Sequence, residues 1–284
     1  MTTNEDAAQA ARDHSLVDAL ADVWGSLQRL GAELDETQWK LPTDCPGWSV
    51  QDNLAHIVSI ESVILGLPAP DVELDPSTLP HVKNDLGRSN EIWVESFRSL
   101  SGAEVLERFH DVAALRLDAL RSSTDADWSA ESWTPVGPGT VRDLIPFRVL
   151  DSWIHELDMR RAVGRPANME SPSARLALGR LRGVLGMIVG ARLRPADGTR
   201  VAFVVEGPGA NTSAYVMHDG RAVALDPVPE PLADGVDAAL YMDADTFVRL
   251  VGGRGELDAV APAVRIEGDA SLGRRVLEHM KVLM

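Results

Sequence analysis

The first half of the chain has the periodicity of amphipathic helices. Apolar residues recur at three- and four-residue steps from Leu16 to Leu30 and from Leu54 to Leu65, which is the spacing of one buried helix face. Further helices are predicted at residues 84–100, 101–121 and 140–163. The Pro-rich stretch 68–80 is predicted to be a long loop. Several long amphipathic helices with one long crossover loop are typical of a four-helix bundle.

Polar residues mark the starts of these helices. Ser49 is followed three residues later by Asp52, which has the form of a capping box with Asp in place of Glu or Gln. Ser101 and Glu104 form a second such pair. The helix that begins at Thr140 is expected to end at Gly164, since glycine is the preferred residue beyond a helix C-terminus.

The second half of the chain changes to a mixed pattern. Short β-like runs separated by Gly, Pro, Asn and Asp are predicted at residues 200–205, 213–217, 222–225, 238–242 and 264–267. Helices are predicted at residues 173–193, 243–251 and 271–283. The polar, Pro-containing stretch 164–172 is typical of a linker. We therefore expect a helical domain at 1–166 and an α+β domain with a mainly antiparallel sheet at 172–284.

Composition excludes several functional classes. The 284 residues carry a net charge of −16 and no concentrated basic face, so we expect no nucleic-acid partner. No apolar run reaches the ~18 residues of a membrane helix, so no membrane partner is expected. The N-terminus lacks the pattern of a signal peptide. Cys45 is the only cysteine, which excludes an intrachain disulfide and favours a soluble cytoplasmic protein.

One stripe of the 140–163 helix carries the candidate chemistry. At 100° per residue, His155 lies about 40° from Asp151, and Arg148 and Asp158 fall on the same side. Apolar residues cover the flanks of this helix, so the charged stripe faces the interior or a cleft, where carboxylates need a cation or a partner. An Asp and a His four apart can bind one ion, and zinc needs a third protein ligand to form an open catalytic site. His56 on the 49–65 helix is the best candidate for that third ligand.

Ordinary structural roles explain the same residues without a metal. Asp151 and His155 fit an i,i+4 hydrogen-bonded pair, and His56 fits a core histidine. Asp158 is expected to orient His155 or to hold an arginine rather than to be a ligand. Cys45 has no basic neighbour in the sequence and is expected to be a buried structural thiol.

Two motifs in the helical half resemble a known family. Residues 43–56 (TDCPGWSVQDNLAH) and 151–164 (DSWIHELDMRRAVG) resemble motifs of DinB-like helical bundles in the mycothiol-dependent maleylpyruvate isomerase family. Residues 266–269 (IEGD), before the last helix, are similar to the sterol-carrier-like domain that such proteins often carry. The resemblance implies a DinB-like metal-binding four-helix bundle followed by a small α+β sterol-carrier-like domain.

The resemblance also implies a ligand set and a cofactor. His56, Asp151 and His155 take the positions of the family's divalent metal ligands, usually for zinc. The family carboxylate is Glu, so Asp151 is a departure that would shift the metal or alter its coordination. Zinc deprotonates a coordinating thiol, and the expected thiol is mycothiol. In the isomerase reaction, thiolate adds to the cis double bond of maleylpyruvate, the adduct rotates, and elimination gives fumarylpyruvate.

The chemistry requires a cation for an acidic or electrophilic small-molecule substrate. Arg148 on the metal stripe is one candidate catalytic residue, and Arg265, Arg274 and Arg275 in the second half are others, although each also fits a surface charge. A mycothiol S-transferase that stops at the conjugate is the nearest alternative function. A non-catalytic metal or thiol sensor and a lipid-binding protein are alternatives from a different class.

Overall fold

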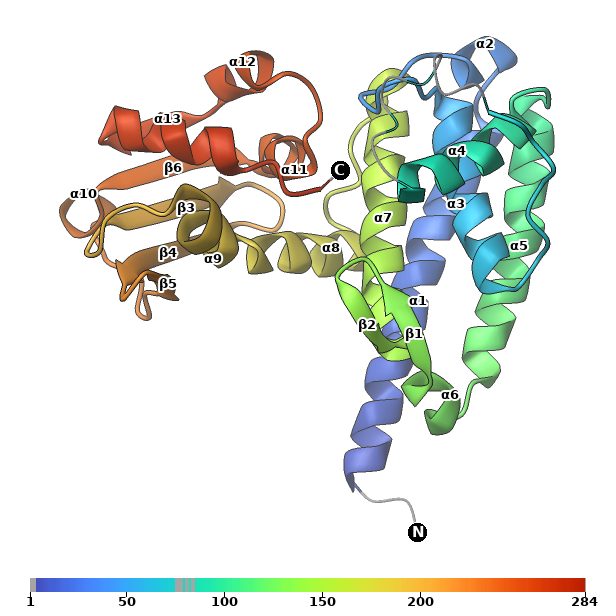
Figure 1. Ribbon diagram of the computed structural model, residues 1–284, viewed down its shortest axis with the longest axis horizontal. Helices are drawn as coiled ribbons and strands as arrows, with labels where there is room; N and C mark the ends of the chain where they lie inside the picture. Colours follow the sequence, from blue (N-terminus) through green and yellow to red (C-terminus); the bar gives the residue numbers. More distant parts are fainter. Residues whose placement is uncertain (1–3, 75–78, 80–81, 83–84, 284) are drawn as a thin grey trace. The chain divides into compact units, whose positions relative to one another are not determined.

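The computed structural model describes residues 4–74, 79, 82 and 85–283 (Figure 1). Their contacts divide the chain between Asn168 and Met169. We call residues 4–168 the N-terminal unit and residues 169–283 the C-terminal unit, and each is described by itself. Within the described residues, no helix combines the length and the apolar character that a membrane span requires.

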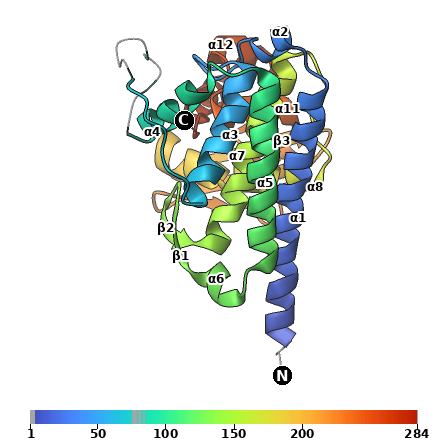
Figure 2. The same cartoon turned by 90° about the vertical axis from the view of Figure 1, so that its right-hand side faces the viewer.

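Four long helices form the core of the N-terminal unit. They are α1 (Asn4–Ala32), α3 (Val50–Ile64), α5 (Gly102–Ser122) and α7 (Val141–Ala162). Helices α1 and α3 each pack against both α5 and α7, and the four run side by side in Figures 1 and 2. Trp24, Leu27, Leu54 and Trp153 are among the fully buried side chains between them. The shorter elements are α2 (Glu36–Trp39), α4 (Asp85–Phe97), α6 (Asp125–Ser129), β1 (Glu131–Thr134) and β2 (Gly137–Thr140).

The predicted capping boxes are present. The Ser49 hydroxyl accepts from the Asp52 backbone N–H, and the Asp52 carboxylate accepts from the Ser49 N–H at 2.8 Å. Aspartate therefore serves in place of the usual Glu or Gln. Ser101 with Glu104 caps α5 in the same way. These bonds satisfy N–H groups that the first helical turn leaves without partners, and they set where each helix begins.

The structure also adds elements that the pattern does not predict. Helices α2 and α6 are single turns, and the turn-rich stretch after residue 134 closes the β1–β2 hairpin. Helix α4 begins at Asp85. Asn84 of the expected helix and residues 75–78 and 80 of the expected loop lie outside the described residues. Elements this short are set by tertiary contacts and not by an apolar period.

The predicted continuous helix at 173–193 is wrong. The chain instead forms α8 (Pro172–Gly183), α9 (Leu185–Met187) and a π-helical turn, η2 (Ile188–Leu193). A Cβ on Gly190 would lie 2.7 Å from the Ala222 backbone nitrogen, so the backbone at Ala222 approaches this turn more closely than any residue other than glycine would allow. The predicted last helix ends at His279 and not at Leu283, because the Leu283 N–H donates to the Val251 carbonyl instead of continuing the helix.

The C-terminal unit is built on a five-stranded sheet in the order β5-β4-β3-β6-β7. The strands are β3 (Arg200–Glu206), β4 (Asn211–His218), β5 (Arg221–Ala224), β6 (Ala238–Asp243) and β7 (Arg265–Gly268). Only the β3–β6 pair is parallel, so the expected mainly antiparallel sheet is confirmed. The remaining elements are α10 (Leu232–Gly235), α11 (Ala244–Gly252), α12 (Leu257–Val260), the 3₁₀ turn η3 (Ala261–Ala263) and α13 (Ala270–His279). Helices α11 and α13 and the turn η2 pack against the strands.

Candidate metal centre

Two neighbouring helices bring the three predicted ligands together. Helix α3 supplies His56, and α7 supplies Asp151 and His155 one turn apart. His56 Nε2 lies 3.6 Å from Asp151 Oδ2, and His155 Nε2 lies 3.7 Å from Asp151 Oδ1. One ligand atom from each residue lies within 4.8 Å of the others. These distances are too long for hydrogen bonds. We call His56, Asp151 and His155 the ligand triad.

The hydrogen bonds of Asn53 determine which nitrogen of His155 carries a proton. The Asn53 amide nitrogen donates to the Ser49 carbonyl at 2.8 Å, so the amide oxygen is the atom that faces His155. That oxygen lies 2.7 Å from His155 Nδ1 and can only accept, so Nδ1 is the donor. In neutral His155 the lone pair of Nε2 therefore faces Asp151.

Nε2 of neutral His155 and the Asp151 carboxylate are consequently hydrogen-bond acceptors that face each other. An imidazole lone pair beside a carboxylate oxygen is unfavourable unless a cation lies between them. Two imidazoles and one carboxylate are a common protein ligand set for catalytic zinc. Tetrahedral zinc with bonds near 2.0–2.1 Å separates its ligand atoms by about 3.4 Å. The two histidine nitrogens lie 3.6 and 3.7 Å from the two oxygens of Asp151, which is close to that separation.

Charge states at the triad also favour a cation. Burial lowers the pKa of His56, outweighing the opposite effect of the Asp151 carboxylate, so this ring is neutral near pH 7. Burial by itself would raise the pKa of Asp151, but the Arg148 guanidinium holds it well below its usual range. The triad therefore offers the negative charge of Asp151 beside the neutral His56 imidazole. His56 Nδ1 is buried and has no hydrogen-bond partner among the described residues.

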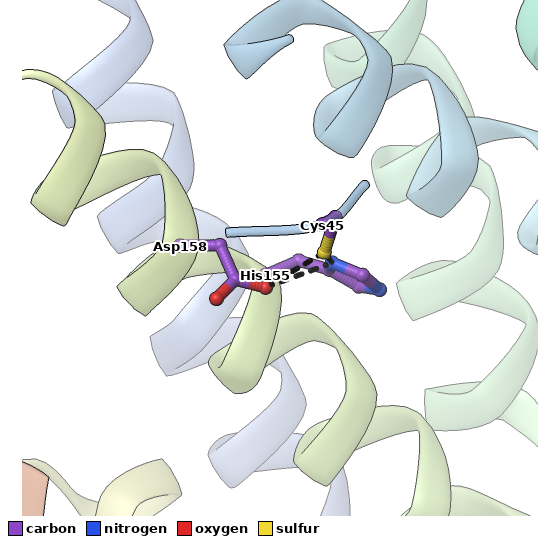
Figure 3. Close-up of side chains that lie close together, drawn as sticks. All are labelled: Cys45, His155 and Asp158. Atoms are coloured by element: carbon purple, nitrogen blue, oxygen red, sulfur yellow. Dashed lines mark hydrogen bonds and ion pairs between the residues drawn. The ribbon is translucent and has the colours of Figure 1, made fainter. Parts of the chain in front are cut away.

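A second cluster supports His155 from the side of Nδ1 (Figure 3). The Cys45 thiol donates to Asp158 Oδ2 at 3.1 Å, and its sulfur lies 3.9 Å from His155 Nδ1. Asp158 also accepts from Arg161 Nη2 at 2.5 Å and lies 3.5 Å from His155 Nδ1. Asp158 thus holds an arginine, as one of the two expected roles has it, and lies beside the His155 ring. We call Cys45, His155 and Asp158 the supporting cluster.

The supporting cluster has the ligand types of a metal site, because its ligand atoms also lie within 4.8 Å of one another. The Nδ1 proton of His155, however, is directed at Asn53, which leaves no lone pair on that side. The ligand triad is therefore the better metal site. The sequence shows no basic neighbour for Cys45, whereas the fold places the His155 ring beside it.

The indole of Trp48 covers one side of the two histidines. Its ring centroid lies 5.0 Å from that of His56 and 5.8 Å from that of His155. The indole N–H donates to the buried Glu91 carboxylate at 2.9 Å, which holds the ring in place. Asp151 is the most exposed ligand, with 32% of its side chain accessible against 6% and 8% for the histidines. A small molecule would therefore reach the site on the Asp151 side.

Arg148 lies behind Asp151 in a network that the sequence analysis missed. Its Nη1 donates to Asp151 Oδ2 at 2.8 Å, and its Nε donates to Glu61 Oε1 at 2.6 Å. Glu61 also accepts from Arg116 Nε at 3.2 Å. Glu61 is the one acidic residue in the apolar run 54–67, and that isolation was the available signal. Arg148 is itself buried, and its contacts in the structure are with Asp151 and Glu61.

The other candidate arginines belong to the C-terminal unit. The Arg265 guanidinium lies 3.7 Å from the centre of the Tyr241 ring and pairs with Glu267. Arg274 on α13, the helix that also carries Arg275, pairs with Asp258 at 2.7 Å and Glu278 at 3.5 Å. Roles of these arginines toward a substrate stay predictions.

Comparisons with known proteins agree with this architecture. Residues 20–160 match the family described as the mycothiol maleylpyruvate isomerase N-terminal domain. Two solved structures share the fold at 15% sequence identity, each covering 91% of this chain and 94% of its own. They are the mycothiol-dependent maleylpyruvate isomerase, with a TM-score of 0.57, and a histidine-to-alanine mutant of that isomerase, with a TM-score of 0.54. No curated protein matches the chain. Through residues 20–160, which contain the whole ligand triad, this chain belongs to the mycothiol maleylpyruvate isomerase N-terminal domain family.

Proposed function

We propose that this chain is a metal-dependent enzyme that uses mycothiol, with a DinB-like four-helix bundle holding the ion and a sterol-carrier-like domain following it. The convergence of two imidazoles and one carboxylate in the ligand triad, with the lone pair of neutral His155 facing Asp151, is the observation that carries the proposal. His56, Asp151 and His155 would hold a divalent cation, most plausibly Zn²⁺ given two imidazoles and a carboxylate. When bound, such an ion supplies the Lewis acidity that converts a thiol to a thiolate near neutral pH.

Residues of this chain would orient the proposed ligands and shape the approach of thiol and substrate to the ion. Asn53 holds the His155 ring so that Nε2 faces the site. Trp48 excludes water from the histidine side, while the partly exposed Asp151 leaves the approach open for a thiol and an acidic or electrophilic substrate. The proposed reaction is addition of the mycothiol sulfur to a carbon–carbon double bond, as the named isomerase relatives imply. We propose that Arg265 or Arg274 binds the acidic substrate, with Arg148 acting on the carboxylate ligand.

The proposal is tested first by metal content. Wild type purified with Zn²⁺ should carry about one ion per chain, and His56→Ala and His155→Ala should lose it, because removal of a ligand disrupts the site. His110→Ala is the matched control, since His110 is an exposed histidine on α5. Elemental analysis of the four proteins measures the outcome. Wild type without metal, or ligand variants that keep it, would contradict the proposal.

The same proteins then distinguish the possible reactions. Wild type mixed with mycothiol and maleylpyruvate should yield fumarylpyruvate only when the thiol is present, and the ligand variants should be inactive. Stable conjugates with model electrophiles, without isomerisation, would instead identify an S-transferase. A metal-free protein that retains bound lipid after purification would favour a carrier function.

A further inference from the structure

A chain of buried charged residues ends at Asp151, the most exposed member of the ligand triad. Glu61 on α3 has only 1% of its side chain exposed and accepts from two arginines on two other helices. Its Oε1 accepts from Arg148 Nε on α7 at 2.6 Å, and its Oε2 accepts from Arg116 Nε on α5 at 3.2 Å. Both guanidinium groups are buried. We call Arg116, Glu61 and Arg148 the ion relay.

The ion relay controls how Arg148 meets Asp151. Arginine commonly grips a carboxylate through two parallel N–H donors. Here Arg148 gives a single donor, Nη1, to Asp151 Oδ2 at 2.8 Å, because Glu61 takes its Nε. The third nitrogen, Nη2, is buried without a hydrogen-bond partner among the described residues. Asp151 Oδ1 consequently has no arginine on it and lies 3.7 Å from His155 Nε2.

We propose that Glu61 is a positioning residue that makes Asp151 a ligand through one oxygen. It holds Arg148 in a one-point contact with Oδ2, which leaves Oδ1 for the cation. Without Glu61, Arg148 can turn to grip both oxygens of Asp151 and compete with the ion. This inference rests on the proposed function, because it assigns the ion relay to the same metal site.

Charge balance supports the same assignment. Arg116 and Arg148 carry two positive charges, and Glu61 offsets one of them beside a site built for a divalent cation. Loss of the Glu61 charge leaves both guanidiniums buried with less compensation, and their repulsion weakens cation binding. Both effects act in the same direction, toward a lower metal affinity.

The test titrates metal-free full-length protein with Zn²⁺ by calorimetry. Glu61→Gln should lower the Zn²⁺ affinity about 10- to 100-fold, which is the usual effect of removing a residue that supports a ligand. Arg148→Lys keeps the positive charge, but a lysine ammonium cannot hold the Glu61 and Asp151 carboxylates together as the guanidinium does. This variant should therefore also bind Zn²⁺ more weakly than wild type. Should Glu61→Gln not fold, Arg148→Lys decides the question.

A matched control separates positioning from stability. Glu156 on α7 follows His155 in the sequence, is fully buried, and accepts from Arg160 and from Ser26 on α1 and not from the ion relay. Glu156→Gln should destabilise the protein comparably but leave the Zn²⁺ affinity unchanged. The visible spectrum of the Co²⁺-loaded protein gives a readout that stability does not move, since it depends on ligand number and geometry. It should change in Glu61→Gln and not in Glu156→Gln.

The possible outcomes are distinguishable. If wild type takes up no Zn²⁺, both the proposed function and the role of Glu61 are overturned. If wild type binds Zn²⁺ while Glu61→Gln or Arg148→Lys binds it equally tightly with an unchanged Co²⁺ spectrum, only the role of the ion relay is overturned. Equal affinity losses in Glu61→Gln and Glu156→Gln would show a general stability effect and would also overturn the positioning role.

Discussion

The two ring nitrogens of His155 have different partners at this site. Its Nε2 faces Asp151, and its Nδ1 donates to Asn53. Asp158 and Cys45 lie on the same side as Nδ1, so the supporting cluster packs against the ring that the ligand triad uses. The sequence spacing alone placed Asp151 and His155 on one helix face. The proton on Nδ1 follows only from the position of Asn53, which lies on another helix.

Substitution of Cys45 distinguishes a stabilising role of its thiol from a role as a metal ligand. Cys45→Ala removes the thiol donor to Asp158 and leaves a small cavity, so it should lower the free energy of unfolding by roughly 1–2 kcal/mol. The Zn²⁺ content should stay that of wild type, because the Nδ1 side of His155 provides no lone pair. Urea denaturation and elemental analysis measure the two quantities. Metal loss as large as that in His56→Ala would show that Cys45 is a ligand.

At the scale of elements, α7 carries two of the three residues of the ligand triad and is anchored at its first turn. Its Thr140–Asp143 capping box sets the start, and Pro146 lies inside the helix without ending it. Arg142 in the first turn donates to Asp13 on α1 and to Asp125 on α6. Apolar periodicity predicts α7 well because the helix is long and mostly buried. It does not predict α2, α6 or the β1–β2 hairpin, since elements of one turn or four residues contain too few apolar positions.

The anchor between α1 and α7 predicts a pH-dependent stability. Burial by itself would raise the pKa of Asp13, but the two hydrogen bonds from Arg142 lower it overall. A carboxyl whose pKa falls on folding stabilises the protein above its unfolded pKa of about 3.9, and this contribution disappears as the pH falls through the folded pKa. Asp13→Asn should therefore lower the free energy of unfolding by roughly 1–3 kcal/mol at pH 7.

Urea denaturation of wild type and Asp13→Asn at pH 7 and near pH 3 measures this effect. The difference between the two proteins should shrink at the acidic pH, because this pH lies below the unfolded pKa of about 3.9, where protonation of Asp13 in the unfolded chain offsets part of the stabilisation. Asp125→Asn removes the exposed partner of the same arginine and should have a smaller effect at both pH values. A difference that does not depend on pH would contradict the role given to the ion pair.

At the scale of the whole molecule, the ligand triad, the supporting cluster and the ion relay all lie within the N-terminal unit. The C-terminal unit has its own core, in which Ala202, Ala214 and Ala239 share one face of the sheet. That face is covered by the partly buried side chains of Leu225, Val228, Leu232, Val236 and Tyr241. Ligand binding in one compact unit is therefore expected to stabilise that unit selectively.

Hydrogen exchange on the full chain tests this selectivity. Zn²⁺ at about 100 times its Kd should stabilise residues around the triad by about 2.7 kcal/mol, because the ion binds the folded state alone. Amides of α3 and α7 should exchange more slowly, while those of β3 and β6 should not change. Protection that rises equally in both units would show that they unfold together and would contradict the expected selectivity.

The amino-acid sequence by itself determined the long helices, their caps, the strands of the sheet and the position of Asp151 and His155 on one face of α7, because apolar period, cap residues and i,i+4 spacing are local properties. It also carried the resemblance to the family that residues 20–160 match. Only the tertiary structure placed His56 opposite α7 and brought Glu61 and Arg116 behind Arg148. These pairings join residues 55 to 95 positions apart in the sequence. Their geometry depends on how the helices pack, which no local pattern encodes.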